Sequence, residues 1–111
     1  MTGYRHFKSA SLRLCVPLGL EADDPEETAR MREGIREIID VRSESRGKGH
    51  ATKLLHNVCT EADVDRKVLM LQVKKFDEGM DEDKLLKFYS RFGFTTIQTE
   101  PVTLMARQND R

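Results

Sequence analysis

The chain has 111 residues and a mass of 12.8 kDa, the size of one domain with a single hydrophobic core. Hydrophobic residues make up 38% of the chain and charged residues 34%, which excludes disordered and low-complexity classes. The 19 basic and 19 acidic side chains cancel, so the composition argues against a protein that holds nucleic acid or an anionic membrane mainly by charge.

Neither a membrane segment nor a metal site is predicted. No apolar run approaches the roughly 20 residues that cross a bilayer, and the start MTGYRHFKSA lacks the apolar stretch of a secretory signal. Cys15, Cys59, His6, His50 and His56 show no metal-ligand spacing. The two cysteines fit a reducing compartment as small buried side chains, while one long-range disulfide stays open. We therefore expect a soluble, cytoplasmic protein.

The first third of the chain predicts strand structure and then a short helix. Polar and apolar residues alternate from Tyr4 to Leu18, which indicates one long strand or a strand pair. An acidic run follows at 21–27 and predicts a loop and then a helix through Met31, which Gly34 ends.

The middle of the chain predicts a strand, a helix and a second strand. Residues 35–41 are rich in β-branched side chains, and a regular strand there puts Ile35, Glu37, Ile39 and Val41 on one face. Apolar residues recur at helical spacing from about residue 48 to residue 62. Residues 67–73 are almost continuously apolar, which is typical of a strand covered on both faces.

Residues 81–92 predict a second helix, with Gly93 as its C-terminal cap and one apolar face made of Leu85, Leu86, Tyr89 and Phe92. Short strands are expected at 94–99 and 102–106. The order of elements predicts one α/β (α+β) domain, in which helices flank a central mixed sheet and the first long helix forms a crossover.

The segment from Val41 to Thr52 carries the clearest chemistry. A strand runs through a glycine-bearing turn into an amphipathic helix, and the free N–H groups at a helix start bind phosphate. Glycines let a ligand approach the backbone closely, and Arg46 and Lys48 add positive charge there. The same residues also fit a tight turn that simply needs glycine. Neither GxxxxGK[ST] nor GxGxxG is present.

Two motifs resemble those of the GCN5-related N-acetyltransferase (GNAT) superfamily. Arg46-Gly-Lys-Gly-His-Ala51 matches the family's acetyl-CoA signature [QR]-x-x-G-x-[GA], and the stretch from Tyr89 to Phe94 is similar to its Y-x-x-x-G-F motif. The resemblance covers residues 34–107. It implies a single GNAT domain over residues 1–111, with an acetyl-CoA-binding core at 34–107 and an abbreviated N-terminal part at 1–33.

The resemblance implies that an amine attacks acetyl-CoA directly, with no metal and no covalent enzyme intermediate. Acetyl-CoA would bind at the strand, loop and helix of residues 35–62. The backbone of Ile39, Asp40 and Val41 would hold the pantetheine arm. The pyrophosphate would lie on Arg46, Gly47, Lys48, Gly49, His50, Ala51 and Thr52. Tyr89 stands where the family's general acid protonates the departing thiolate; without the motif it reads as a core aromatic.

A base must take a proton from the attacking amine, directly or through water. Glu37 is the first candidate because a regular strand places it on the face of Ile39 and Val41. A solvated strand carboxylate fits Glu37 equally well. Glu33 and Glu44 are poorer candidates, and a chain of water molecules is a further alternative.

The sequence departs from the family pattern at several places. Ser43 replaces a frequent proline, and Glu82 stands where many members carry an asparagine that contacts CoA. The short region before residue 34 leaves the amine acceptor undefined and predicts an open sheet edge, so we expect a homodimer. The acidic run at 21–27 fits either a region that attracts a cationic amine acceptor or a solvated loop. Residues 76–80 fit either a lid or a plain loop.

The partners predicted from these features are acetyl-CoA and an amine acceptor, with no nucleic acid and no membrane. The alternative to an N-acetyltransferase is a GNAT-like module that has lost catalysis and serves as a CoA-binding or protein-interaction domain.

Overall fold

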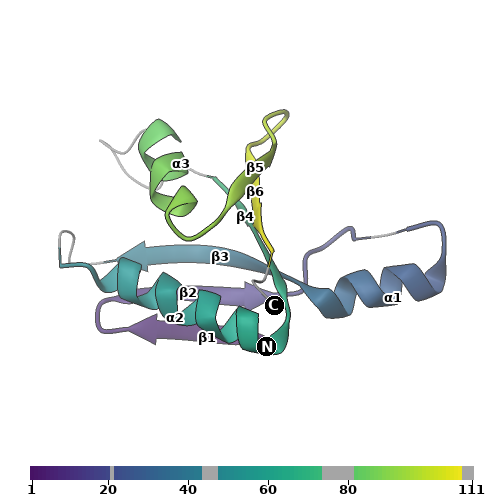
Figure 1. Cartoon of the computed structure of the whole chain (residues 1–111), viewed down its shortest axis with the longest axis horizontal. Coiled ribbons are helices and arrows are strands. Elements are labelled where there is room, and N and C mark those ends of the chain that lie inside the picture. Colours follow the sequence, from purple (N-terminus) through teal and green to yellow (C-terminus); the bar gives the residue numbers. More distant parts are fainter. Residues whose placement is uncertain (21, 44–47, 74–81, 109–111) are drawn as a thin grey trace.

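The computed structural model describes residues 1–20, 22–43, 48–73 and 82–108. They form one mixed sheet with the strand order β1-β2-β3-β4-β6-β5, together with helices α1, α2 and α3 (Figure 1). The strands are β1 (Gly3–Phe7), β2 (Ala10–Cys15), β3 (Ile35–Ser43), β4 (Val68–Gln72), β5 (Thr95–Gln98) and β6 (Leu104–Arg107). The helices are α1 (Pro25–Gly34), α2 (His50–Asp65) and α3 (Glu82–Ser90).

The N-terminal alternation forms a strand pair rather than one long strand. β1 and β2 run antiparallel as a hairpin, and β2 then pairs antiparallel with β3. The hairpin reverses at Lys8, whose φ of 51° is the left-handed conformation that such a turn requires.

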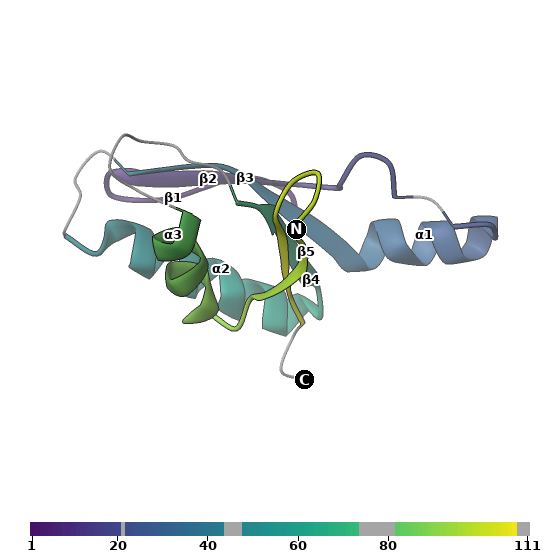
Figure 2. The same ribbon diagram turned by 90° about the horizontal axis from the view of Figure 1, so that it is seen from above.

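α2 provides the crossover that the element order predicts. β3 and β4 are parallel neighbours, so a long connection must carry the chain back, and α2 is that connection. Its buried residues are Leu54, Leu55, Val58, Cys59 and Ala62. They pack against one face of the sheet, which contributes Leu12, Leu14, Ile38, Leu69 and Leu71. α3 lies on the same side of the sheet as α2 (Figure 2) and adds Leu85 and Tyr89 to this core.

β4 is covered on one face only, so the prediction of a strand buried on both faces was wrong. Leu69 and Leu71 are buried, whereas the alternating residues Val68, Met70 and Gln72 are half-buried. The two covering helices lie on one side of the sheet, and α1 does not cover the other (Figure 2). The apolar run therefore packs one row of side chains into the core and leaves the other row partly open.

β3 carries a bulge that breaks the predicted alternation. Ser11 pairs with Arg42 and Arg13 pairs with Ile39, so Leu12 alone faces Asp40 and Val41. Paired residues share a face, and the extra residue therefore moves Val41 to the face of Ile38. The prediction that Glu37, Ile39 and Val41 share a face holds for the first two and was wrong for Val41.

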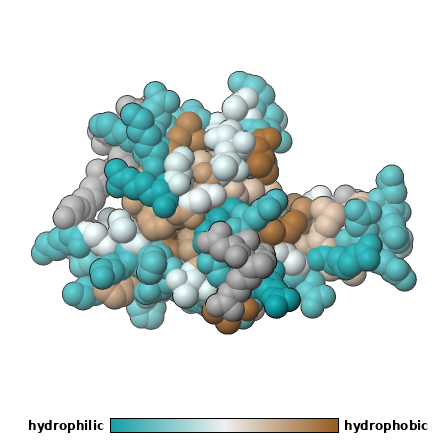
Figure 3. Space-filling model, viewed as in Figure 1, coloured by the Kyte–Doolittle hydropathy of each residue, from teal (hydrophilic) through white to brown (hydrophobic). Residues whose placement is uncertain are grey.

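α1 projects from the body of the molecule (Figure 1) and has no buried residue. The Asp24 carboxylate accepts a hydrogen bond from the Glu26 N–H and caps its start, and Pro25 occupies the first turn. The helix continues through Gly34, beyond the predicted end at Met31. Its far end is hydrophilic, whereas apolar surface appears in several separate places on the body (Figure 3).

α3 ends at Ser90, before the predicted end at residue 92, and Gly93 lies in the turn that follows the helix. Gly93 has a φ of 93°, a left-handed conformation that glycine adopts without a steric penalty. Its N–H donates to the Ser90 carbonyl, and the next residue, Phe94, returns to the core. β5 and β6 then close the sheet as an antiparallel pair.

Both cysteines are free thiols, so the alternative of a disulfide between Cys15 and Cys59 was wrong. Within the described ranges, no group of three or more His, Cys, Asp or Glu side chains lies close enough to hold a metal ion. The helices described here include none that is both long and apolar enough to cross a bilayer.

Candidate active site

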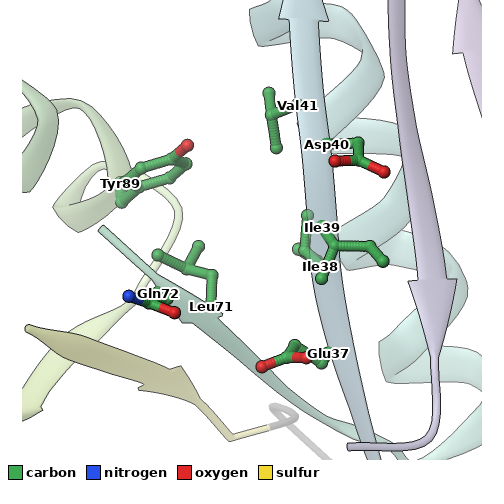
Figure 4. Close-up of a pocket in the computed structure, with 8 residues that line it drawn as sticks. All are labelled: Glu37, Ile38, Ile39, Asp40, Val41, Leu71, Gln72 and Tyr89. Atoms are coloured by element: carbon green, nitrogen blue, oxygen red, sulfur yellow. The ribbon is translucent and has the colours of Figure 1, made fainter. Parts of the chain in front are cut away.

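The cleft lies where β3 and β4 separate. Their parallel pairing runs from Ile35 and Val68 to Ile38 and Leu71, and β3 then continues to Ser43 while β4 ends at Gln72. The space between them measures about 490 Å³, including the part open to solvent. It is lined by Glu37, Ile38, Ile39, Asp40, Val41, Leu71, Gln72 and Tyr89 (Figure 4). The backbone of β3 beyond Ile38 is thus free of β4 on this side.

The bulge of β3 forms one wall of this cleft. Asp40 has a φ of 54°, which is uncommon for a residue with a side chain and concentrates at functional sites. Its carboxylate points away from the cleft (Figure 4), toward β2, where Asp40 Oδ2 lies 3.2 Å from Arg13 Nη2. Val41 points into the cleft instead.

Tyr89 reaches the cleft from α3. Its hydroxyl points toward β3 (Figure 4), although only 3% of the residue is exposed. The rings of Phe88 and Phe94 meet the Tyr89 ring edge-on, at centroid distances of 5.4 and 6.0 Å. Burial raises the pKa of Tyr89 to about 12 because the phenolate loses its hydration. Tyr89 therefore keeps its proton at every physiological pH.

Glu37 lines the cleft from β3, and its carboxylate points to the β4 side (Figure 4). The Cys15 thiol donates a weak hydrogen bond to the Glu37 carbonyl, with 3.9 Å between sulfur and oxygen. Burial raises the Cys15 pKa, and the Glu37 carboxylate raises it further. Of the poorer base candidates, Glu33 lies in α1 and not among the cleft residues, and Glu44 lies outside the described residues.

The predicted phosphate-binding turn is described in part. Arg46 and Gly47 lie outside the described residues, whereas Lys48 and Gly49 are exposed just before α2. Gly49 has a φ of 73°, so this position favours glycine. The first intrahelical bond runs from the Lys53 N–H to the Gly49 carbonyl, which leaves the earlier N–H groups of α2, those of His50, Ala51 and Thr52, without a helical partner.

The start of α2 is suited to an anion. Among the described residues no side chain caps it, and its first turn holds no acidic residue. The described part of the chain therefore leaves the positive end of the helix dipole open to an anion. The His50 ring is fixed at this point: its Nδ1 lies 2.7 Å from the Ser9 hydroxyl, and the Phe7 ring meets it edge-on at 6.0 Å. The turn of the first hairpin therefore packs against the start of α2.

The cleft brings together the predicted residues Glu37, Ile39, Asp40, Val41 and Tyr89. It also includes Ile38, Leu71 and Gln72, which sequence reasoning missed. In the sequence, Ile38 and Leu71 cannot be distinguished from core residues of their strands. The polar residue Gln72, at the end of an apolar run, was the one sign of a cleft among these three.

Two other sequence features have different outcomes. The Glu82 carboxylate, at the position of the family's frequent asparagine, accepts a hydrogen bond from the Thr103 hydroxyl. The Glu82 side chain therefore contacts the residue that directly precedes β6. The predicted lid or loop at 76–80 lies outside the described residues.

Comparison with known proteins identifies the fold. The sequence matches no protein-family model, and no curated protein matches it. Among solved structures, the anti-CRISPR protein AcrVA5 superposes with a TM-score of 0.68 at 15% identity, covering 95% of this chain and 96% of that one. An acyl-CoA N-acyltransferase from Pseudomonas aeruginosa gives a TM-score of 0.55 at 23% identity, with 88% of this chain and 59% of that one covered.

A protein assigned to the GNAT acetyltransferase family from Bacteroides thetaiotaomicron gives a TM-score of 0.57 at 17% identity, with 92% of this chain and 56% of that one covered. The chain thus spans less than two thirds of the length of either acyltransferase structure. The chain has a GNAT-like fold: one α+β domain with a mixed sheet flanked by helices.

Proposed function

We propose that the protein is an N-acetyltransferase that moves an acetyl group from acetyl-CoA to a primary amine. The observation that carries the proposal is the cleft itself: in a GNAT-like fold, β3 bulges away from β4 and a buried tyrosine hydroxyl faces the opening (Figure 4). Acetyl-CoA supplies an activated thioester. Residues of this chain must bind the ligand, donate a proton to the leaving sulfur and accept a proton from the amine.

The free edge of β3 fits an extended ligand. Beyond Ile38 the backbone of β3 has no β4 partner, which supports our assignment of the backbone of Ile39, Asp40 and Val41 to the amides of a pantetheine arm. Ile38, Val41 and Leu71 add apolar walls that exclude water from the thioester.

The start of α2 fits the phosphates of the same ligand. The turn glycine Gly49, the N–H groups of His50, Ala51 and Thr52, and the exposed Lys48 combine unpaired donors with positive charge. Since β3 leads directly toward this turn, the two halves of an extended CoA molecule would meet consecutive parts of the chain. We assign Arg46 and Gly47 to the same phosphate site on the resemblance of the motif.

Tyr89 is the proposed general acid. Its hydroxyl faces the cleft and carries its proton, so it can donate to the sulfur as the thiolate leaves. Glu37 is the proposed base for the incoming amine, because it is the carboxylate whose side chain points to the β4 side of the cleft. Direct attack then needs no covalent enzyme intermediate.

Thiol release from acetyl-CoA tests this function. We expect the protein to liberate free CoA only when a suitable amine is present, in a panel of polyamines, aminoglycosides and lysine peptides. Binding of acetyl-CoA without release on any amine would favour a GNAT-like module without catalysis. Glu82 supports that second candidate. Its carboxylate accepts a hydrogen bond from Thr103, and it offers no amide donor where many GNAT members carry an asparagine that contacts CoA.

A further inference from the structure

Arg13 of β2 lies outside the cleft and outside both sequence motifs, yet it contacts the residue at the centre of the bulge. We propose that Arg13 is a positioning residue: its ion pair with Asp40 holds the bulge of β3 in the shape that presents the backbone to acetyl-CoA. The ligand in this inference rests on the proposed function, whereas the bulge can be measured without any ligand.

The bulge needs support because its backbone is strained. Asp40 is a non-glycine residue with a φ of 54°, and L residues populate that region rarely. β3 has an available alternative, since regular pairing with β2 would remove the positive φ. Something outside Asp40's own backbone must therefore favour the bulged register.

The register determines what lines the cleft. A shift of one residue moves every following side chain to the other face of a strand. With the bulge, Val41 shares the face of Ile38 and lines the cleft, and the exposed Arg42 lies on the opposite face. Without it, Val41 and Arg42 would exchange faces, and a charged side chain would enter the apolar wall.

Arg13 contacts the bulge from the adjacent strand. It pairs directly with Ile39, and its Nη2 reaches 3.2 Å from the carboxylate of Asp40, the next residue along β3. The Tyr4 ring of β1 holds the guanidinium from the other side, with 5.7 Å between the ring centroid and the central guanidinium carbon. Because the Asp40 carboxylate points away from the cleft, the pair acts on the backbone and not on the ligand (Figure 4).

Steady-state kinetics of Arg13 variants test the inference. We expect Arg13→Met to raise the KM for acetyl-CoA about fivefold, in keeping with the modest strength of a partly exposed ion pair, while kcat changes little. Arg13→Lys keeps the charge and should show a smaller increase. Arg5→Met is the matched control, because Arg5 lies in the same hairpin and pairs with Glu61 of α2, away from the cleft.

Two substitutions of Asp40 separate backbone positioning from a direct role of the carboxylate. Alanine disfavours a positive φ and glycine adopts it freely. We therefore expect Asp40→Ala to raise the KM for acetyl-CoA more than Asp40→Gly does. Equal increases would show that the backbone conformation at residue 40 does not determine acetyl-CoA binding and would overturn the proposal.

Amide hydrogen exchange of the free protein gives a readout that needs no acetyl-CoA. Exchange at residues 39–42 should be faster in Arg13→Met than in wild type or Arg5→Met, since loss of the pair loosens the bulge. Unchanged exchange there would overturn the positioning role. Failure of wild-type protein to bind acetyl-CoA would instead remove the proposed function, so the two failures are distinguishable.

Discussion

Tyr89 combines two roles that usually exclude each other, a core aromatic and a residue of the cleft. Only 3% of it is exposed, and its ring packs against two phenylalanines, yet its hydroxyl faces β3. Its pKa of about 12 lies above the roughly 8.5 of an ordinary thiol. Tyr89 therefore holds its proton firmly, and in the proposed role of general acid it would donate fully only if the same dry cleft also raised the pKa of the departing thiolate.

Tyr89→Phe tests that role directly. We expect turnover to fall by about 10²- to 10⁴-fold, the usual contribution of a general acid. The Kd for acetyl-CoA should stay within about twofold, because the ring and its packing remain. Thiol-release kinetics and isothermal titration measure the two quantities. Unchanged turnover would remove Tyr89 as the acid.

The same burial makes stability depend on alkaline pH. In the unfolded chain Tyr89 ionises near pH 10, whereas in the folded protein its pKa is about 12. Below pH 10 both states keep the proton, so stability is unaffected; between pH 10 and 12 only the unfolded state ionises, and the free energy of unfolding falls by about 2 kcal/mol.

Urea unfolding at pH 9 and pH 11.5 measures this loss, with Tyr89→Phe as the control for all other groups that titrate there. The wild type should lose more stability than the variant over this interval. Equal losses in the two proteins would show that Tyr89 is not buried as described.

Residue-scale prediction from the sequence depended on the family resemblance. Tyr89 comes from one motif, and Ile39 and Asp40 come from the strand before the other; all three line the cleft, and their roles stay predictions. Leu71 and Ile38 were not, because an apolar residue in a strand carries no mark that distinguishes a cleft wall from the core.

At the scale of elements, α2 and β6 are joined by a buried ion pair. The guanidinium of Arg107 makes two hydrogen bonds of 2.8 and 3.0 Å to the Asp63 carboxylate, and its Nε donates to the Phe92 carbonyl at 2.6 Å. Its side chain is only 8% exposed. One residue therefore ties α2, the end of α3 and the last strand together.

Arg107→Met should lower the free energy of unfolding by about 3 kcal/mol, because it removes both hydrogen bonds from the guanidinium to the largely buried Asp63 carboxylate. Arg5→Met removes a more exposed pair, with side chains 27% and 33% exposed, and should cost about 1 kcal/mol or less. Chemical denaturation compares them. Similar losses would contradict the structural role of Arg107.

The elements themselves were predictable, and their irregularities were not. Periodicity placed α2, α3 and all the strands to within a few residues, and Gly34 marked the end of α1. The bulge at Asp40 was not predicted, because a periodicity argument assumes that the alternation continues along the strand. Nothing in the sequence near Asp40 shows that β3 has one residue more than β2 at this point. The open face of β4 escaped for a similar reason, since the length of an apolar run does not reveal which helices cover it.

At the scale of the whole molecule, two features are unusual for an isolated chain. α1 has ten residues with none buried, and helices that short are marginal in water without tertiary contacts. β1 is an edge strand with its outer side unpaired among the described strands. Both features are consistent with our expectation of a homodimer.

Sedimentation equilibrium at micromolar concentration tests that expectation. We predict a mass near twice the 12.8 kDa of the chain. Pairing through the β1 edge would also slow amide exchange in β1, where the free edge otherwise exchanges quickly. A mass of one chain over the whole concentration range would contradict the dimer.

The fold of the whole molecule was predicted from two short motifs and not from overall sequence similarity. No family model matches, and the solved structures share 15–23% identity with this chain. The glycine turn and the tyrosine motif therefore predicted a fold that overall sequence similarity does not reveal. The acceptor side has no comparable signature, so the amine stays undefined.

The central claim, that acetyl-CoA binds between β3 and β4 and at the start of α2, is tested most directly by thermal unfolding in the presence of acetyl-CoA. A ligand that binds only the folded state stabilises it, by about 2.7 kcal/mol at one hundred times its Kd. We therefore predict that the unfolding midpoint rises with acetyl-CoA concentration, by about 10 °C near saturation. An unfolding midpoint that does not move at millimolar acetyl-CoA would contradict the account.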